Sequence, residues 1–467
     1  MSSTVDMTLG NPTKHLLKFA LPLLLANFGQ QLYMLVDAAI VGRGVGVKAL
    51  AAVGATDWTC WLILWSAIGF TQGFSTFISR YFGDKNYAGI NKVIATSTLL
   101  CLAIGGILTV AGLALANPIL TLLNTPDDII DGASTYLITM LSGTIIVMMY
   151  NMASSVLRAL GDGKTPLIAM IIAGLLNVAL DCLFVFAFHW GIFGAAIASV
   201  ISQAVSFIYC LVRVLKIDFV KLDRAAWKLD WKMTKDLLTF GAPIAFEYIV
   251  ISLGGIILQS SINLQGSTFI AGYTATNKVY GLLECSATSL GLACSTFLAQ
   301  NYGAKLYDRV KAGVKTSIKI VVIMAIVVLS ITLLLRKYML LLFLDVNEVG
   351  GHEALDIAMR YLTIMTVFLI ALYLIHVFRN ALQAIGISSW SFLSGIAEFA
   401  CRVFMAKVAV RWAWLGSDAL FVSEPVAWFG ALLAVVVPYF YYRKKLLKTD
   451  DVTKNADETA DVSCSRL

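Results

Sequence analysis

The chain has 467 residues, of which 59% are hydrophobic and only 13% are charged, and it carries a formal net charge of +7. Soluble domains are roughly 25% charged, so a water-soluble fold of this size could not bury so much apolar surface. The composition therefore excludes an ordinary soluble protein. It indicates an all-α polytopic membrane protein, because helices satisfy their own backbone hydrogen bonds inside a bilayer.

Twelve apolar segments follow one another along the chain, and each is long enough to cross a bilayer, which takes about 20 residues. The predicted transmembrane helices cover residues 16–41, 51–79, 93–116, 134–157, 166–188, 192–215, 237–262, 269–299, 313–335, 357–382, 389–412 and 422–442. An even number of spans places both ends of the chain on the same side of the membrane.

Lys and Arg are unevenly distributed between the loops on the two sides of the predicted bundle. The segment 213–235 alone carries seven of them, whereas Arg43 and Lys48 are among the few on the opposite side. Since Lys and Arg concentrate in cytoplasmic loops, both termini are predicted to be cytoplasmic, in a multi-pass protein of the plasma (inner) membrane. The same asymmetry explains the positive net charge, so no nucleic-acid partner is expected.

The two halves of the sequence repeat one another. The run Ser-Thr-Phe at 75–77 leads to Gly83, and the same run at 295–297 leads to Gly303 at an offset of 220 residues. We therefore expect two pseudo-symmetric six-helix bundles around a central cleft, related by an axis along the membrane normal. The expected parts are an N-terminal lobe over 1–220, a cytoplasmic linker over 221–236, a C-terminal lobe over 237–445 and a disordered cytosolic tail over 446–467.

Motifs for enzymatic or nucleotide chemistry are weak. Gly163, Lys164 and Thr165 resemble the end of a P-loop, but Arg158 stands where that motif needs a glycine. The cysteines and histidines have no metal-ligand spacing, so we expect no enzyme activity, no cofactor and no structural metal. Transport by such a chain would draw on an ion gradient or be passive.

Three polar residues of the first half lie at membrane depth, where a charge costs about 2.5–3.5 kcal/mol and usually faces a cavity or a partner. Asp37 lies near the outer end of the first predicted span, and Asn177 and Asp181 lie four residues apart on one face of the fifth. Both spans run outward, so the two acids could share one pocket. Since two adjacent carboxylates resist being charged together, the pair predicts a site for H⁺ or Na⁺, with Asn177 adding an amide oxygen.

Other polar residues extend this prediction. Tyr136 and Asn151 on the fourth span are expected to complete the lining of the cation pocket, and Gln30 is expected to face the substrate cleft from the first span. Simpler explanations stay open. Asp37 and Tyr136 could be merely interfacial, Asp181 could be a packing group, and Gln30 and Asn151 could bond to neighbouring helices.

The second half carries a different set of polar residues. Glu247, Glu284 and His376 are predicted to line the cleft, where the two acids would contact a cationic substrate. Glu398 and Arg402 lie four residues apart on one span and are predicted to neutralise each other as a structural pair.

A set of short motifs, taken together, resembles the multidrug and toxic compound extrusion (MATE) family over about residues 10–445. The motifs are Pro22, Gln31-Leu32-Tyr33, Val36-Asp37, Val41-Gly42-Arg43, residues 49–54, Gly83-Asp84-Lys85, residues 158–162 and residues 177–181. The resemblance implies a V-shaped pair of six-helix bundles that exports organic cations in exchange for H⁺ or Na⁺.

The resemblance also implies a location for the coupling site. In the DinF-like branch, an Asp of the first span and an Asn and an Asp of the fifth bind the cation, and Asp37, Asn177 and Asp181 match them. Tyr136 and Asn151 match further members of that site. The NorM branch uses acids of spans seven and ten, and the tenth span here has none, so the chain looks closer to the DinF-like branch.

The sequence therefore predicts a secondary active multidrug efflux transporter, acting as a monomer on small organic cations or amphiphiles in contact with membrane lipid. A lipid-linked oligosaccharide flippase of the same superfamily, a membrane-embedded enzyme and a passive channel remain alternatives. The flippase would need a larger cationic cavity, and Lys278 and Arg402 are the main basic residues within the predicted spans. No catalytic cluster and no filter-like loop is visible in the sequence.

Overall fold

The structure is a computed structural model that describes residues 4–123, 125–224, 226–228, 230–344, 346, 350–412 and 416–464. Helices dominate this described part of the chain, and it contains no strand. They are α1 (Pro12–Gly44), α2 (Val47–Gly83), α3 (Tyr87–Leu122), α4 (Asp127–Ser142), α5 (Thr144–Ala159), α6 (Lys164–Asp181), α7 (Gly191–Leu215), α8 (Trp231–Ile262), α9 (Ser267–Gly303), α10 (Tyr307–Leu340), α11 (Gly351–Ala384), α12 (Ser389–Lys407) and α13 (Asp418–Cys464). A π-helical segment, Cys182–Ala187, continues α6.

The helices coincide with the predicted spans. Ten helical segments of the described chain are long and apolar enough to cross a membrane, or eleven when the bent pair α4 and α5 counts as one span. The remaining span is α12, which carries Glu398, Arg402 and Lys407 and packs between α8 and α13. The all-α fold with about twelve transmembrane helices is thus confirmed.

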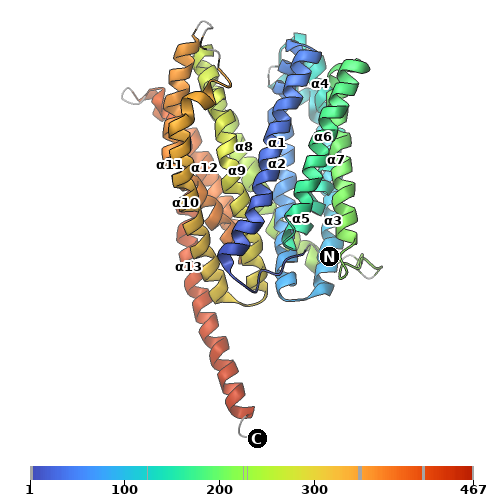
Figure 1. Ribbon diagram of the computed structural model, residues 1–467, viewed down its shortest axis with the longest axis vertical. Coiled ribbons are helices and arrows are strands. Elements are labelled where there is room, and N and C mark those ends of the chain that lie inside the picture. Colours follow the sequence, from blue (N-terminus) through green and yellow to red (C-terminus); the bar gives the residue numbers. More distant parts are fainter. Residues whose placement is uncertain are drawn as a thin grey trace.

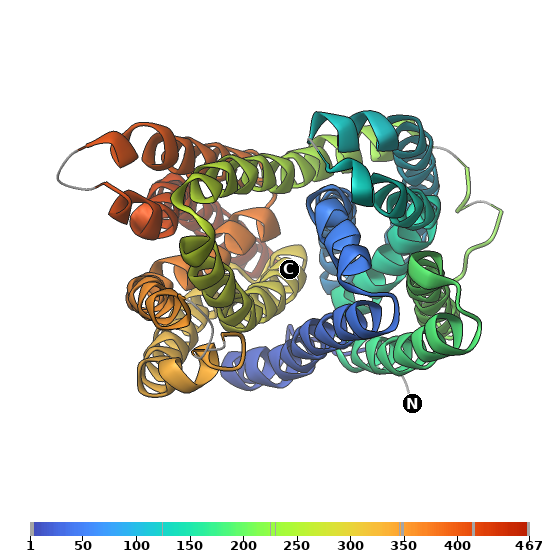
Figure 2. The same cartoon turned by 90° about the horizontal axis from the view of Figure 1, so that it is seen from above.

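Two lobes make up the molecule, one from α1 to α7 and the other from α8 to α13 (Figures 1 and 2). The first and second helices of each half join the lobes, because α1 packs against α9 and α2 packs against both α8 and α9. In Figure 1 the lobes converge toward the end that carries both chain termini and diverge toward the other. We call these the closed end and the open end.

Equivalent glycines close the lobes against each other. A Cβ on Gly83 of α2 would overlap the carbonyl oxygen of Gln300 on α9, and a Cβ on Gly303 of α9 would overlap the carbonyl oxygen of Arg80 on α2. Only glycine allows two backbones to approach this closely. The 220-residue repeat therefore corresponds to a symmetric helix crossing.

Polar contacts strengthen the closed end. Arg80 donates to the carbonyl oxygens of Gln383 and Ala384 in the last turn of α11, at 2.9 to 3.0 Å. The segment before α1 also spans both lobes, since Val5 donates its N–H to the Leu160 carbonyl and Met7 donates its N–H to Gln300 Oε1. Met7 is only 1% exposed, so this segment is part of the packed interior.

Some boundaries differ from those expected. The predicted span 134–157 is two helices that bend by 46° at Gly143, whose absent side chain makes room for Val200. The predicted linker 221–236 overlaps α8, because Asp230 accepts from the N–H groups of Lys232 and Met233 and starts that helix early. Residues 446–464 were expected to be disordered, but α13 continues to Cys464, as no glycine or proline after Pro438 interrupts it.

Candidate functional site

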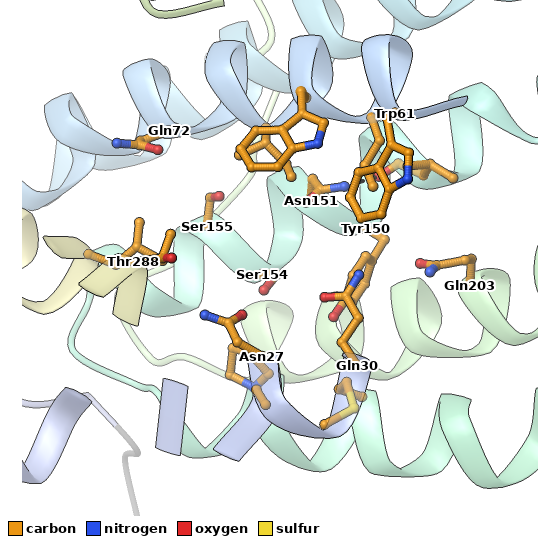
Figure 3. A pocket seen from close by; sticks show the side chains of 18 of the residues that line it. Asn27, Gln30, Trp61, Gln72, Tyr150, Asn151, Ser154, Ser155, Gln203 and Thr288 are labelled. Carbon is orange, nitrogen blue, oxygen red and sulfur yellow. Dashed lines mark hydrogen bonds between the residues drawn. The ribbon is translucent and has the colours of Figure 1, made fainter. Parts of the chain in front are cut away.

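A cavity of about 390 Å³ lies between the lobes. Its walls come from α1, α2, α4, α5, α6 and α7 of the first lobe and from α9 of the second. Figure 3 shows Gln72 and Thr288 toward one end of this space and Trp61 and Gln203 toward the other. Aromatic and methionine side chains make up much of the apolar wall: Tyr33, Met34, Trp61, Trp65, Tyr136, Met140, Tyr150 and Met170.

Asp37 and Asp181 meet at the edge of this cavity, as predicted. Asp37 lies on α1 and lines the cavity, while Asp181 is the last residue of α6 and is fully buried. Their carboxyl groups lie close enough to interact electrostatically. Two neighbouring carboxylates repel each other when both are charged.

The oxygens of this pair lack donors. Asp37 Oδ1, both carboxylate oxygens of Asp181 and Asn177 Oδ1 are buried, and no described hydrogen-bond partner reaches them. Asn177 uses its amide nitrogen instead, which donates to Ser199 Oγ at 3.3 Å. A buried acceptor without a donor lowers the stability of the protein. A cation bound among these oxygens would remove that loss of stability.

The backbone at Asp181 changes from an α-helix to a π-helix, because the π segment Cys182–Ala187 begins at the next residue. Such π segments are rare and occur frequently at functional sites. No sequence signal used above predicted this change.

The remaining predicted members of the cation pocket also border the cavity. Tyr136, from α4, is 8% exposed and lies close enough to Asp37 to interact with its charge. Asn151, from α5, is 9% exposed and donates one amide N–H to the Val147 carbonyl at 2.9 Å, so its oxygen and its second N–H are available to a ligand. Of the five predicted pocket residues, three line the cavity, and the other two, Asn177 and Asp181, are buried on α6.

The predicted cleft residues divide into two groups. Gln30 of α1 and Glu284 of α9 line the cavity. Glu247 does not, because it turns into the second lobe and pairs with Arg379, with 2.8 Å between Oε1 and Nε. His376 does not line it either, since α9 approaches it at Gly291 on the side of α11 that packs within the lobe. For these last two residues the cleft prediction is wrong, since the rotation of α8 and α11 turns them away from the cavity.

Glu247 belongs to a buried ion network. Arg379 also contacts Glu398 at 3.3 Å, Arg402 contacts Glu398 at 2.7 Å, and Arg402 pairs with Glu424 of α13 at 2.7 Å. The predicted structural pair of Glu398 and Arg402 is thus confirmed as the centre of a five-residue network. Every acid in it has an arginine partner, unlike Asp37 and Asp181.

Two charged residues of the cavity wall were not predicted to have a role in the site. Arg158, near the end of α5, lines the cavity, as does Asp57 on α2. Asp57 interacts electrostatically with Lys278 of α9. A signal for the latter pair does exist in the sequence: the offset of 221 that relates Pro22 to Pro243 also relates Asp57 to Lys278.

Comparison with known proteins agrees with this architecture. The sequence profile of the family described as MatE matches residues 22–183 and 243–408, one stretch in each lobe. The chain is 31% identical to "Probable multidrug resistance protein YoeA" of Bacillus subtilis (strain 168) over 443 residues, which cover 91% of this chain and 93% of that relative. The chain belongs to the MATE family.

More distant relatives resemble this MATE chain over most of its length. It is 24% identical to "Probable multidrug resistance protein NorM" of Thermotoga maritima, over 88% of this chain and 90% of that one. A solved structure described as "Outward-facing conformation of a multidrug resistance MATE family transporter of the MOP superfamily" superimposes with a TM-score of 0.88 at 23% identity, over 95% of this chain and 99% of that chain. At that identity the likeness concerns the fold of the MATE chain.

Proposed function

We propose that this MATE chain is a multidrug efflux transporter that exports small amphiphilic compounds, many of them cationic, in exchange for H⁺ or Na⁺. The names of its relatives from Bacillus subtilis and Thermotoga maritima support the export of drugs. The cavity between the lobes supports a central binding site. In this proposal the chain is a monomer in the plasma (inner) membrane, and its closed end, with both termini, faces the cytoplasm.

One observation carries the proposal for ion coupling. Asp37 and Asp181 face each other beside the cavity with no described basic partner. In the second lobe, Glu247, Glu398 and Glu424 are all paired with arginine. A site that repeatedly binds and releases a cation must not be neutralised by a fixed one, so the first lobe is the better place for coupling, as in the DinF-like branch.

The mechanism follows from this geometry. In the outward-open state, H⁺ or Na⁺ enters from the open end and binds between Asp37 and Asp181, with Asn177 Oδ1 as a further oxygen ligand. Binding removes the repulsion between α1 and α6 and shifts the equilibrium between conformations, so that substrate leaves outward. Tyr136 and Asn151 border this site and would sense the movement of α1.

The cavity wall supports amphiphilic substrates. Asp37, Asp57 and Glu284 supply negative charge, and the aromatic wall supplies apolar and cation–π surface. A lipid-linked oligosaccharide flippase would need a cationic cavity for a pyrophosphate group. Arg158 alone does not provide one, so drug efflux fits this wall better.

Efflux from cells tests the proposal. We expect Asp37→Asn and Asp181→Asn each to abolish the export of a cationic dye at normal expression, because an amide cannot bind and release a proton and holds a cation poorly. Asp84→Asn is the matched control, since Asp84 is exposed in the turn between α2 and α3. Undiminished export by both site variants would contradict ion coupling at this pair.

A further inference from the structure

The closed end of the cavity holds a positive charge that the mechanism above does not use. Arg158 lies in the last turn of α5, and its guanidinium donates from Nη1 to Ser154 Oγ and from Nη2 to Ser155 Oγ, both at 2.6 Å. Side chains of a helix lean toward its N-terminus, and α5 runs from the open end to the closed end. The guanidinium therefore extends into the cavity that it lines.

Arg158 lacks an acidic partner in the part of the chain that the structure describes. The acid nearest in sequence, Asp162, is engaged elsewhere, because it accepts from the N–H groups of Lys164 and Thr165 and from the Thr165 hydroxyl. In contrast, Arg402 in the other lobe pairs with two glutamates. A cation withdrawn from water without a counter-charge is costly, so an anionic group of a ligand would be stabilised here.

The groups around Arg158 suit an anionic oxygen. A guanidinium has five N–H donors, and Ser154 and Ser155 take two of them. Since both serines accept from the guanidinium, their own hydroxyl protons are left to donate to other acceptors. Figure 3 shows Ser154 and Ser155 on the cavity side of α5, across from Asn27 of α1.

Two of the negative charges of the cavity lie toward the opposite end, whereas Glu284 lies near the middle of α9. Asp37 is seven residues from the open end of α1, and Asp57 is ten residues from the open end of α2. Arg158 is one residue from the closed end of α5. The cavity is therefore bipolar along its length, with Asp37 and Asp57 toward the open end, Glu284 near the middle and the Arg158 guanidinium toward the closed end.

We propose that Arg158, Ser154 and Ser155 form an anion subsite that binds the carboxylate of a zwitterionic amphiphile, whose cationic group lies toward Asp37 and Asp57. This inference rests on the proposed efflux function and names one class of its substrates. A planar guanidinium with free N–H groups binds carboxylate in a fixed, bidentate geometry. Substrates without a carboxylate would use the same cavity but not this subsite.

Transport of a matched dye pair tests the subsite. Wild-type and Arg158→Gln protein in everted membrane vesicles would be given a rhodamine with a free carboxylate, which is a zwitterion, and its methyl ester, which is a cation. We expect Arg158→Gln to lower transport of the zwitterion about tenfold relative to the ester, as loss of a charge-assisted hydrogen bond implies. Arg158→Lys should keep a larger share of zwitterion transport than Arg158→Gln.

Controls separate this inference from the proposed function. Arg213→Gln is the matched control, because Arg213 is exposed on α7 and contacts Tyr209 away from the cavity. If wild type exports neither dye, the proposed function fails. If wild type exports both and Arg158→Gln lowers the two equally or not at all, the subsite alone is overturned.

Two further measurements complete the test. If Arg158→Gln fails to reach the membrane, the subsite can be tested by dye affinity instead. The affinity of purified wild type and Arg158→Lys for the two dyes would be measured from quenching of the cavity tryptophans Trp61 and Trp65. Equal affinity of wild type for zwitterion and ester would overturn the subsite. Translocation of a fluorescent zwitterionic phospholipid that depends on Arg158, without export of the zwitterionic dye, would assign the site to a lipid phosphate and also overturn the proposal.

Discussion

Buried charge takes two forms in this chain, and the difference is visible residue by residue. In the second lobe, Arg402 and Arg379 hold three glutamates in a network whose side chains are at most 11% exposed. In the first lobe, Asp37 and Asp181 interact with each other and have no basic partner among the described residues. The first arrangement fixes a packing, whereas the second leaves room for a mobile cation.

Truncation of the network should destabilise the protein. We expect Arg402→Ala to lower the free energy of unfolding by about 3–5 kcal/mol, because it leaves Glu424 buried without its arginine and Glu398 with Arg379 alone. Arg360→Ala is the matched control, since its pair with Asp418 is exposed and such pairs contribute at most about 1 kcal/mol. Unfolding in mixed micelles, followed by tryptophan fluorescence, measures both. An equal loss of unfolding free energy in Arg402→Ala and Arg360→Ala would mean that the network does not stabilise the lobe.

At the residue scale, the sequence predicts which residues form a pair better than it predicts which way a side chain points. Four-residue spacing was enough to predict the Glu398–Arg402 pair, and equal depth was enough to bring Asp37 and Asp181 together. Glu247 was misassigned, because the rotation of a helix about its axis depends on packing that a nearly uniform apolar sequence does not reveal. In the sequence Arg158 stands out only as part of a motif, and its lack of an acidic partner among the described residues is visible only in three dimensions.

The helices of the first lobe show how short local signals shape an element. Gly143 breaks one predicted span into α4 and α5 with a 46° bend. Asn11 caps α1 by accepting from the N–H of Thr13, and Pro12 starts the helix. Sequence patterns predicted the existence and order of these helices, but the bend depends on the fit of Gly143 against Val200, which only the tertiary structure supplies.

The first turn of α8 should respond to pH. Asp230 caps this helix, and its ion pair with Lys92, on α3, holds the pKa of that carboxyl below its ordinary value. A lowered pKa means that the contact stabilises the folded state above the unfolded value of about 3.9 and is lost as pH falls through the folded value. The protection of the Lys232 and Met233 amides against exchange, relative to the intrinsic rate at each pH, should therefore fall below about pH 4. Asp230→Ala should lower this protection at neutral pH, and unchanged exchange in that variant would exclude the cap.

The crossing of α2 and α9 should tolerate no side chain. We expect Gly83→Ala to force the helices apart, because its Cβ would overlap the Gln300 carbonyl oxygen. The closed end would then open more often, and a cysteine at position 7 would react faster with a maleimide, by about tenfold for a shift of 1.4 kcal/mol. Gly106→Ala is the matched control, since nothing lies within 4 Å of a Cβ there. An unchanged rate in Gly83→Ala would argue against the crossing as the closure.

At the scale of the whole molecule, the repeat in the sequence and the symmetry of the fold agree. Residues separated by about 220 positions meet across the molecular axis at the closed end, where Gly83 and Gly303 occupy equivalent places. The fold class could be predicted because bilayer thickness and backbone hydrogen bonding leave few choices. The conformation of the structure could not be predicted from the sequence, because one sequence must serve both the outward-open and the inward-open state.

The unpaired carboxylates of the first lobe are the centre of this account, and gradient-driven transport tests them most directly. Purified protein in liposomes would be loaded with a cationic dye and given an inward H⁺ or Na⁺ gradient. We expect one of these gradients to accelerate dye movement in the wild type, and we expect Asp181→Asn to lose this acceleration while it still binds the dye. Equal acceleration in wild type and Asp181→Asn, with either ion, would contradict this expectation.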